Sequence, residues 1–101
     1  MTKKEVEQVL VEILNDMIEM YELPEMEITA ETKLIEDLGF SSVDIMHMLA
    51  TADMRFQAHV PYEEMVLKDG EYVTELAVGE VAAYVSENIH RATNEPQNMA
   101  E

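Results

Sequence analysis

The sequence predicts an all-α domain, a four-helix bundle of three main helices and one short helix with a long first loop. Apolar residues recur at three- and four-residue intervals in three segments, at about residues 3–20, 42–56 and 78–89. The chain has 101 residues, which is enough for one modest core and too few for two. Its apolar content of 48% argues against disorder.

The first helix is predicted from about residue 3 to about residue 20. Thr2 and Glu5 have the spacing of a capping box, and Pro24 removes a backbone donor just after the predicted end. The residues at helical spacing on its apolar face are Val6, Val9, Leu10, Ile13, Leu14 and Met17.

A connection of about twenty residues follows, and it carries Ile28, Leu34 and Leu38 as apolar anchors for the core. A connection this long inside a small domain is usually functional or contains a short turn of its own. We therefore expect a functional site near its end.

The second helix, from about Ser42 to Phe56, carries two apolar stripes. The first is the core face, Ile45, Met48, Leu49, Ala52 and Phe56. The second comprises Val43, Met46, Ala50 and Met54 on an adjoining face. Two interpretations of the second stripe remain open: it completes a broad core face, or it is an exposed docking surface whose methionines make adaptable contacts.

The remainder of the chain predicts a short helix over residues 59–65 with Pro61 in its first turn, and a turn at residues 68–71. Residues 72–75 are expected to be extended or looped. The last helix, about Val78 to Ile89, has its core face at Val78, Val81, Ala82, Val85 and Ile89. These assignments give a domain over residues 1–90 and a disordered tail over residues 91–101.

The charge of the chain limits its partners. With 22 acidic and 6 basic residues, the net charge is −16, which disfavours nucleic acid and anionic membranes and favours basic protein partners. The chain has no Cys and no apolar run long enough for a membrane span or a signal peptide. We expect a cytoplasmic monomer.

The segment Asp37-Leu-Gly-Phe-Ser-Ser-Val-Asp44 is the candidate site. Gly39 allows a tight turn, and Ser41 or Ser42 can cap the helix that follows. Ser41 and Asp44 fit the reciprocal capping pattern loosely. A serine at a helix start lies beside unpaired backbone N–H groups, which is favourable for a phosphate. The alternative is that both serines only cap the helix.

The string Leu34-Ile-Glu-Asp-Leu-Gly-Phe-Ser-Ser-Val-Asp44 resembles the phosphopantetheine attachment site of acyl carrier proteins. In that family an Asp-Ser-Leu triplet follows a Leu-Gly turn, and its serine carries the prosthetic arm. Leu38, Gly39 and Ser42 match this pattern, and Asp44 matches an acid common two positions after the serine. Ser41 and Val43 replace the Asp and the Leu. The resemblance in helix order and spacing covers roughly residues 2–89.

The resemblance implies a carrier protein that is not itself an enzyme. A phosphopantetheinyl transferase would move 4′-phosphopantetheine from coenzyme A to Ser42. Loading and condensing enzymes would then use the arm to hold acyl or aminoacyl intermediates as thioesters, in fatty acid, polyketide or peptide assembly. We expect partners to contact Val43, Met46, Ala50, Met54 and Asp44. The competing hypothesis is a non-covalent acidic helical adaptor, in which Ser42 only caps the helix.

The second helix is the least acidic helical part of the chain, because residues 41–56 hold Asp44 and Asp53 against Arg55, a net charge of −1. In the family that this chain resembles, the corresponding helix is usually the acidic one. We therefore expect docking through the apolar stripe, so that Met46→Glu weakens partner binding more than Asp53→Ala.

Catalytic and metal chemistry are not expected. The histidines His47, His59 and His90 fall on different elements. His47 lies more than one helical turn after Ser42, which disfavours a Ser-His pair. A calcium loop starting at Asp37 would have Met48 where a bidentate Glu is required.

Overall fold

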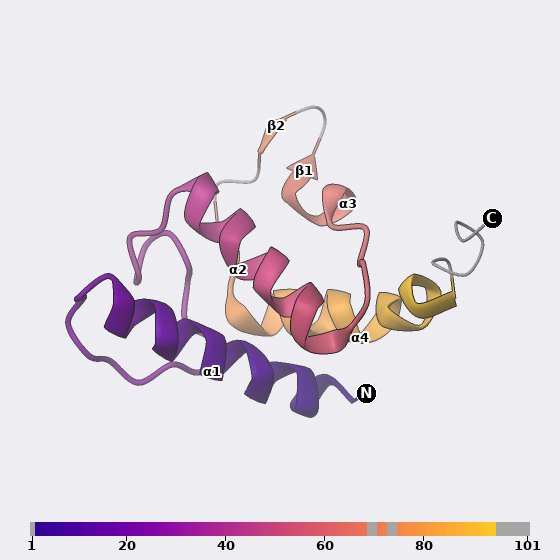
Figure 1. Ribbon diagram of the computed structural model, residues 1–101. Helices are drawn as coiled ribbons and strands as arrows, with labels where there is room; N and C mark the ends of the chain where they lie inside the picture. The colour runs from indigo at the N-terminus through magenta and orange to yellow at the C-terminus, as the bar shows by residue number, and fades with distance from the viewer. Residues whose placement is uncertain (1, 69–70, 73–74, 95–101) are drawn as a thin grey trace.

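Three long helices and one short helix form the fold in the computed structural model, which describes residues 2–68, 71–72 and 75–94 (Figure 1). The helices are α1 (Lys3–Met20), α2 (Ser42–Phe56), α3 (Glu63–Val66) and α4 (Val78–Asn94). Two strands, β1 (Leu67–Lys68) and β2 (Glu71–Tyr72), form a short antiparallel hairpin after α3. The predicted all-α helical bundle is confirmed, and the hairpin is its one unpredicted element among the described residues.

The start of α1 is fixed by the predicted capping box. The Glu5 N–H donates to Thr2 Oγ1 at 3.1 Å, and the Thr2 N–H donates to Glu5 Oε1 at 2.8 Å. The helix then buries the side chains of Val6, Leu10, Ile13, Leu14, Met17 and Ile18. Val9, predicted on the same face, is partly buried against the core.

The end of α1 is a Schellman turn. The Leu23 N–H donates to the Ile18 carbonyl at 2.9 Å, and Glu22 occupies the left-handed region with φ of 58°. Pro24 follows the turn, as is common after a helix end. Glycine is the usual residue at such a position, because a side chain there crowds the backbone.

We expect Glu22→Gly to stabilise the protein by a few tenths to about 1 kcal/mol, since glycine relieves the left-handed strain but loses more entropy on folding. Urea unfolding measures this change. Glu25→Gly is the control, because it removes the same charge at a position without positive φ. Equal stabilisation by both variants would show that charge, rather than backbone strain, is responsible.

The long connection contains a short turn of its own, directly before α2. The Gly39 N–H donates to the Ile35 carbonyl at 2.9 Å, and the Phe40 N–H donates to the Leu34 carbonyl at 3.0 Å. Gly39 has φ of +71°, so this turn needs glycine. The predicted anchors Ile28, Leu34 and Leu38 are all buried.

Backbone contacts hold this connection against the start of α4. The Leu34 N–H donates to the Leu76 carbonyl, and the Val78 N–H donates to the Thr32 carbonyl, both at 2.9 Å. The Gly79 N–H reaches the Ala30 carbonyl at 2.8 Å. A Cβ at Gly79 would lie 3.1 Å from Ala30 Cβ, so glycine permits this close approach.

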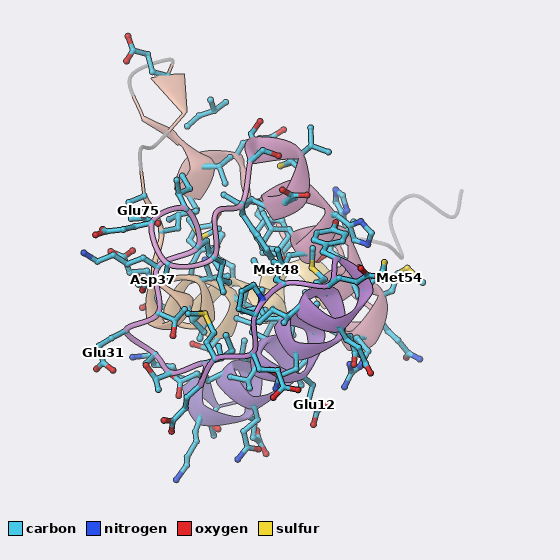
Figure 2. The ribbon with its side chains drawn as sticks, turned by 90° about the vertical axis from the view of Figure 1, so that its left-hand side faces the viewer. Glu12, Glu31, Asp37, Met48, Met54 and Glu75 are labelled. Carbon is cyan, nitrogen blue, oxygen red and sulfur yellow. The ribbon has the colours of Figure 1, made fainter. Side chains whose placement is uncertain are left out.

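Glu75 reinforces the same junction. Its carboxylate accepts hydrogen bonds from the Ile35 and Glu36 N–H groups, both at 2.9 Å, and from the Leu76 N–H at 3.1 Å. Desolvation opposes ionisation, but these three donors outweigh it and hold the pKa of Glu75 below its ordinary value. Figure 2 shows Glu75 and Asp37, which belongs to the preceding turn, on the same side of the molecule.

The core lies between α1, α2 and α4, and α1 contacts both of the other long helices. In α2 the predicted core residues Ile45, Met48, Leu49 and Ala52 are buried, and Phe56 is partly buried. In α4 the five predicted core residues are all buried: Val78, Val81, Ala82, Val85 and Ile89.

The structure changes two predicted boundaries. The short helix α3 begins at Glu63 rather than at residue 59, because Val60 and Tyr62 before it are bound to the Asp53 side chain. Helix α4 continues to Asn94, past the predicted end at Ile89 and into the segment predicted as a tail. Residues 95–101 of that predicted tail lie outside the described residues.

None of the helices in the described ranges is both long enough and apolar enough to cross a membrane.

Candidate functional site

Ser41 and Ser42 have different roles at the start of α2. Ser41 is the N-cap: its Oγ accepts the Asp44 N–H at 3.4 Å, and its own N–H donates to Asp44 Oδ2 at 2.9 Å. The Ser41 hydroxyl also donates to Asp44 Oδ2 at 3.1 Å. Ser42 is the first helical residue, its side chain is exposed, and its hydroxyl makes no hydrogen bond within the described part of the chain. Both side chains are exposed, and Ser42 has the hydroxyl of the pair that is not engaged in the cap.

The Asp44 carboxylate stabilises this helix start. Hydrogen bonds from the Ser41 backbone and side chain, together with Tyr21 and His47, hold the pKa of Asp44 below its ordinary value despite partial desolvation. A lowered folded-state pKa means that the carboxylate contributes stability when it is ionised. This contribution is complete above the ordinary Asp pKa of about 3.9 and is lost as the pH falls through the lower folded value.

We expect Asp44→Asn to be less stable than the wild-type protein at neutral pH, because a neutral amide oxygen is a weaker acceptor than the ionised carboxylate for the two Ser41 donors. The difference between the two proteins should start to shrink as the pH falls below about 4, where the unfolded chain takes up a proton at Asp44, and should disappear once the pH is below the lower folded-state pKa. Urea unfolding at several pH values measures it. A difference that persists undiminished at low pH would contradict this account of the capping box.

The second apolar stripe of α2 lies on the surface. Val43, Met46 and Met54 are 73%, 47% and 79% exposed, and Ala50 is also exposed. Figure 2 shows Met54 at the outer edge of the fold and Met48 in its interior. The stripe therefore does not complete the core face. We call these four residues the α2 stripe.

The α2 stripe leads to Ser42. Met46, Ala50 and Met54 follow Ser42 at four-residue intervals, so the four side chains form one ridge along the helix. From Ser42 to Met54 the ridge is about 18 Å long, at about 1.5 Å per residue. Asp44 lies away from this ridge, because residues two apart in a helix do not share a face.

Asp53 precedes Met54, the last residue of the ridge, and its side chain is bound to other residues of the protein. Its carboxylate accepts hydrogen bonds from the Tyr62 hydroxyl at 3.0 Å and from the Val60 N–H at 3.3 Å, and lies 3.4 Å from His59 Nδ1. Its side chain is only 15% exposed. Asp53→Ala would therefore disturb the connection between α2 and α3, and it is not a clean probe of surface charge.

The role of Tyr21 at this site was not predicted from the sequence. Tyr21 follows α1, and its ring packs edge-on against Phe40, with 6.3 Å between ring centroids and 64° between ring planes. Partial desolvation and the nearby Asp44 carboxylate raise the pKa of Tyr21. No sequence motif links residues 21 and 44. Their proximity comes from the fold, in which α1 and α2 run in opposite directions, so that Tyr21 at the end of α1 lies near the start of α2 (Figure 1).

Comparisons with known proteins returned no match: no protein-family model, curated protein or solved structure aligned significantly with this chain.

Proposed function

We propose that this chain is a carrier protein that bears a 4′-phosphopantetheine arm on Ser42. The observation that carries the proposal is the division of roles between the two serines. Ser41 satisfies the capping requirement of α2, which leaves the Ser42 hydroxyl exposed and unbonded on the first helical turn. A hydroxyl that is not needed for the cap can be esterified without loss of the helix start.

The surroundings of Ser42 fit a phosphodiester. The N–H groups of Ser42 and Val43 have no acceptor among the described residues. They belong to the first turn of α2, at the positive end of the helix dipole. The carboxylate of Asp44 is directed to Ser41 rather than to Ser42. A phosphate on Ser42 would thus find donors nearby.

Attachment would proceed by phosphoryl transfer. The Ser42 oxygen attacks the phosphorus of coenzyme A that bears the pantetheine, and the phosphoanhydride bond to 3′-phosphoadenosine 5′-phosphate breaks. The leaving group departs with the bonding electron pair, and the serine proton passes to a base of the transferase. We assign the base and the metal ion to the transferase, and to this chain only the presentation of the hydroxyl.

When bound, the arm supplies a terminal thiol that can hold an acyl or aminoacyl group as a thioester. The chain itself has no Cys, so the arm would be the one source of thiol chemistry. The residues of this chain present the arm and keep it away from the core, since Ser42 lies on the exposed side of α2.

Partner enzymes would dock along the α2 stripe. An enzyme that covers Met46 and Met54 would have Ser42 at one edge of the contact surface, where the arm could reach the active site of that enzyme. The exposed stripe carries no charged residue, whereas the whole chain carries −16. Acidic residues elsewhere would therefore attract a basic partner at long range, and the thioethers would make the close contacts.

The exposure of the α2 stripe also favours a second candidate function, an adaptor that binds an apolar helix or groove without any modification. In that case the exposed hydroxyl of Ser42 would have no chemical role.

Intact mass after coexpression with a broad-specificity phosphopantetheinyl transferase separates the two functions. The carrier predicts a gain equal to one phosphopantetheine group. A chain that never gains this mass, in coexpression or with purified transferase and coenzyme A, would support the adaptor and refute the carrier.

A further inference from the structure

Tyr21 contacts both sides of the Ser41-Ser42 pair. Its ring packs against Phe40, the residue immediately before the pair. Its phenol lies near enough to the Asp44 carboxylate for each to shift the pKa of the other, and that carboxylate accepts both hydrogen bonds from Ser41. Tyr21 is the C-cap residue directly after α1, so it links the end of α1 to the start of α2 at the candidate site.

Ser42 has no contacts of this kind. Its hydroxyl makes no hydrogen bond within the described ranges, and its side chain faces solvent. The backbone on either side therefore sets the position of its Cβ, from which the hydroxyl extends. Phe40 is buried at 4% exposure, and the capping box fixes Ser41, so the support beneath these residues determines where Ser42 lies.

We propose that Tyr21 is a positioning residue for the modification of Ser42, acting through Phe40 on one side and Asp44 on the other. This inference rests on the carrier function proposed above and adds a residue that does not touch the reacting atoms. A small displacement of a nucleophile is costly, since an error of about 1 Å can reduce a rate on the order of a hundredfold.

Two variants separate the contributions of the ring and the hydroxyl. Tyr21→Ala removes both, and we expect kcat/KM for transfer from coenzyme A to fall by roughly ten- to a hundredfold, mainly in kcat, because the α2 stripe still binds the transferase. Tyr21→Phe keeps the ring against Phe40, and most of the activity should return. Met20→Ala is the matched control, because Met20 is the preceding residue and is 62% exposed. It should load like the wild-type protein.

Two measurements do not depend on the loading reaction. Hydrogen exchange of the Asp44 amide, which donates to Ser41, should be faster in Tyr21→Ala than in Met20→Ala. An NMR titration of the Asp44 carboxyl should show a higher pKa in Tyr21→Phe than in the wild-type protein. Loss of the Tyr21 hydroxyl removes one of the groups that favour the charged form, while Ser41 and His47 remain.

Wild-type kcat/KM in Tyr21→Ala, or an equal loss in Met20→Ala, would overturn the inference. An Asp44 pKa that is unchanged in Tyr21→Phe would overturn the part assigned to the hydroxyl. These outcomes differ from failure of the proposed function, in which the wild-type protein itself gains no arm and both proposals fall together.

Discussion

Ser42→Ala is expected to abolish attachment of phosphopantetheine while leaving the fold intact. The variant lacks the nucleophile, so no transferase can form the phosphodiester bond. Its helix start should survive, because Ser41 rather than Ser42 accepts the Asp44 N–H. Intact mass measures the attachment, and thermal unfolding measures the fold. The expected result is complete loss of the mass gain with a melting temperature close to that of the wild-type protein.

Ser41→Ala is the matched control, with the opposite expected result. It removes the N-cap and should cost ~1 kcal/mol of stability. Attachment should remain possible, because the Ser42 hydroxyl is untouched. If Ser42→Ala gained the arm and Ser41→Ala did not, the roles assigned here to the two serines would be reversed.

Met46→Glu is expected to weaken binding of the transferase or of a pathway enzyme by roughly tenfold or more. Docking along the α2 stripe would bury the new carboxylate without a partner, and tenfold corresponds to about 1.4 kcal/mol. Titration calorimetry or surface binding measures the affinity. Raising the salt concentration should slow association more than it weakens the complex, because distant charges steer the encounter while apolar contacts hold it.

Met26→Glu is the control for this variant, because it introduces the same charge at a methionine of similar exposure, 41% against 47%, outside α2. Its affinity should stay close to the wild-type value. We use Met26→Glu in place of Asp53→Ala, because the Asp53 carboxylate accepts hydrogen bonds from Val60 and Tyr62 and its loss would disturb the fold. Equal weakening by Met26→Glu and Met46→Glu would show that partners respond to total charge rather than to the stripe.

The helices could be predicted from sequence because their signals are local. The Thr2 and Glu5 capping box lies within one turn, and the apolar spacing of α1, α2 and α4 gives their core faces directly. Gly39 was identified for the same reason, since a glycine after an apolar turn commonly takes positive φ. The predicted position of Ser42 in the first turn of α2 is confirmed.

Contacts between distant segments could not be predicted. Tyr21 follows α1 and Asp44 lies in α2, and Glu75 binds backbone groups of Ile35 and Glu36 that carry no sequence signature. The spacing of apolar residues also left open whether the α2 stripe was buried. The same spacing is found whether or not another part of the chain packs on that face of the helix. Only the arrangement of α1, α3 and α4 around α2 decided it.

The hairpin and the end of α4 were missed for a different reason. Each strand of the hairpin is two residues long, which is too short for a recognisable alternation of apolar and polar residues. The last residues of α4 lack the apolar periodicity from which its end was predicted, and residues 90–94 contain no proline or glycine that would stop the helix earlier.

Fragment mass spectrometry of the peptide that contains Ser41 and Ser42 tests the central claim most directly. The wild-type protein, incubated with coenzyme A and a phosphopantetheinyl transferase, should carry one arm per chain, and the fragments should place it on Ser42. An arm located on Ser41, or a peptide that stays unmodified after exhaustive incubation, would contradict the account.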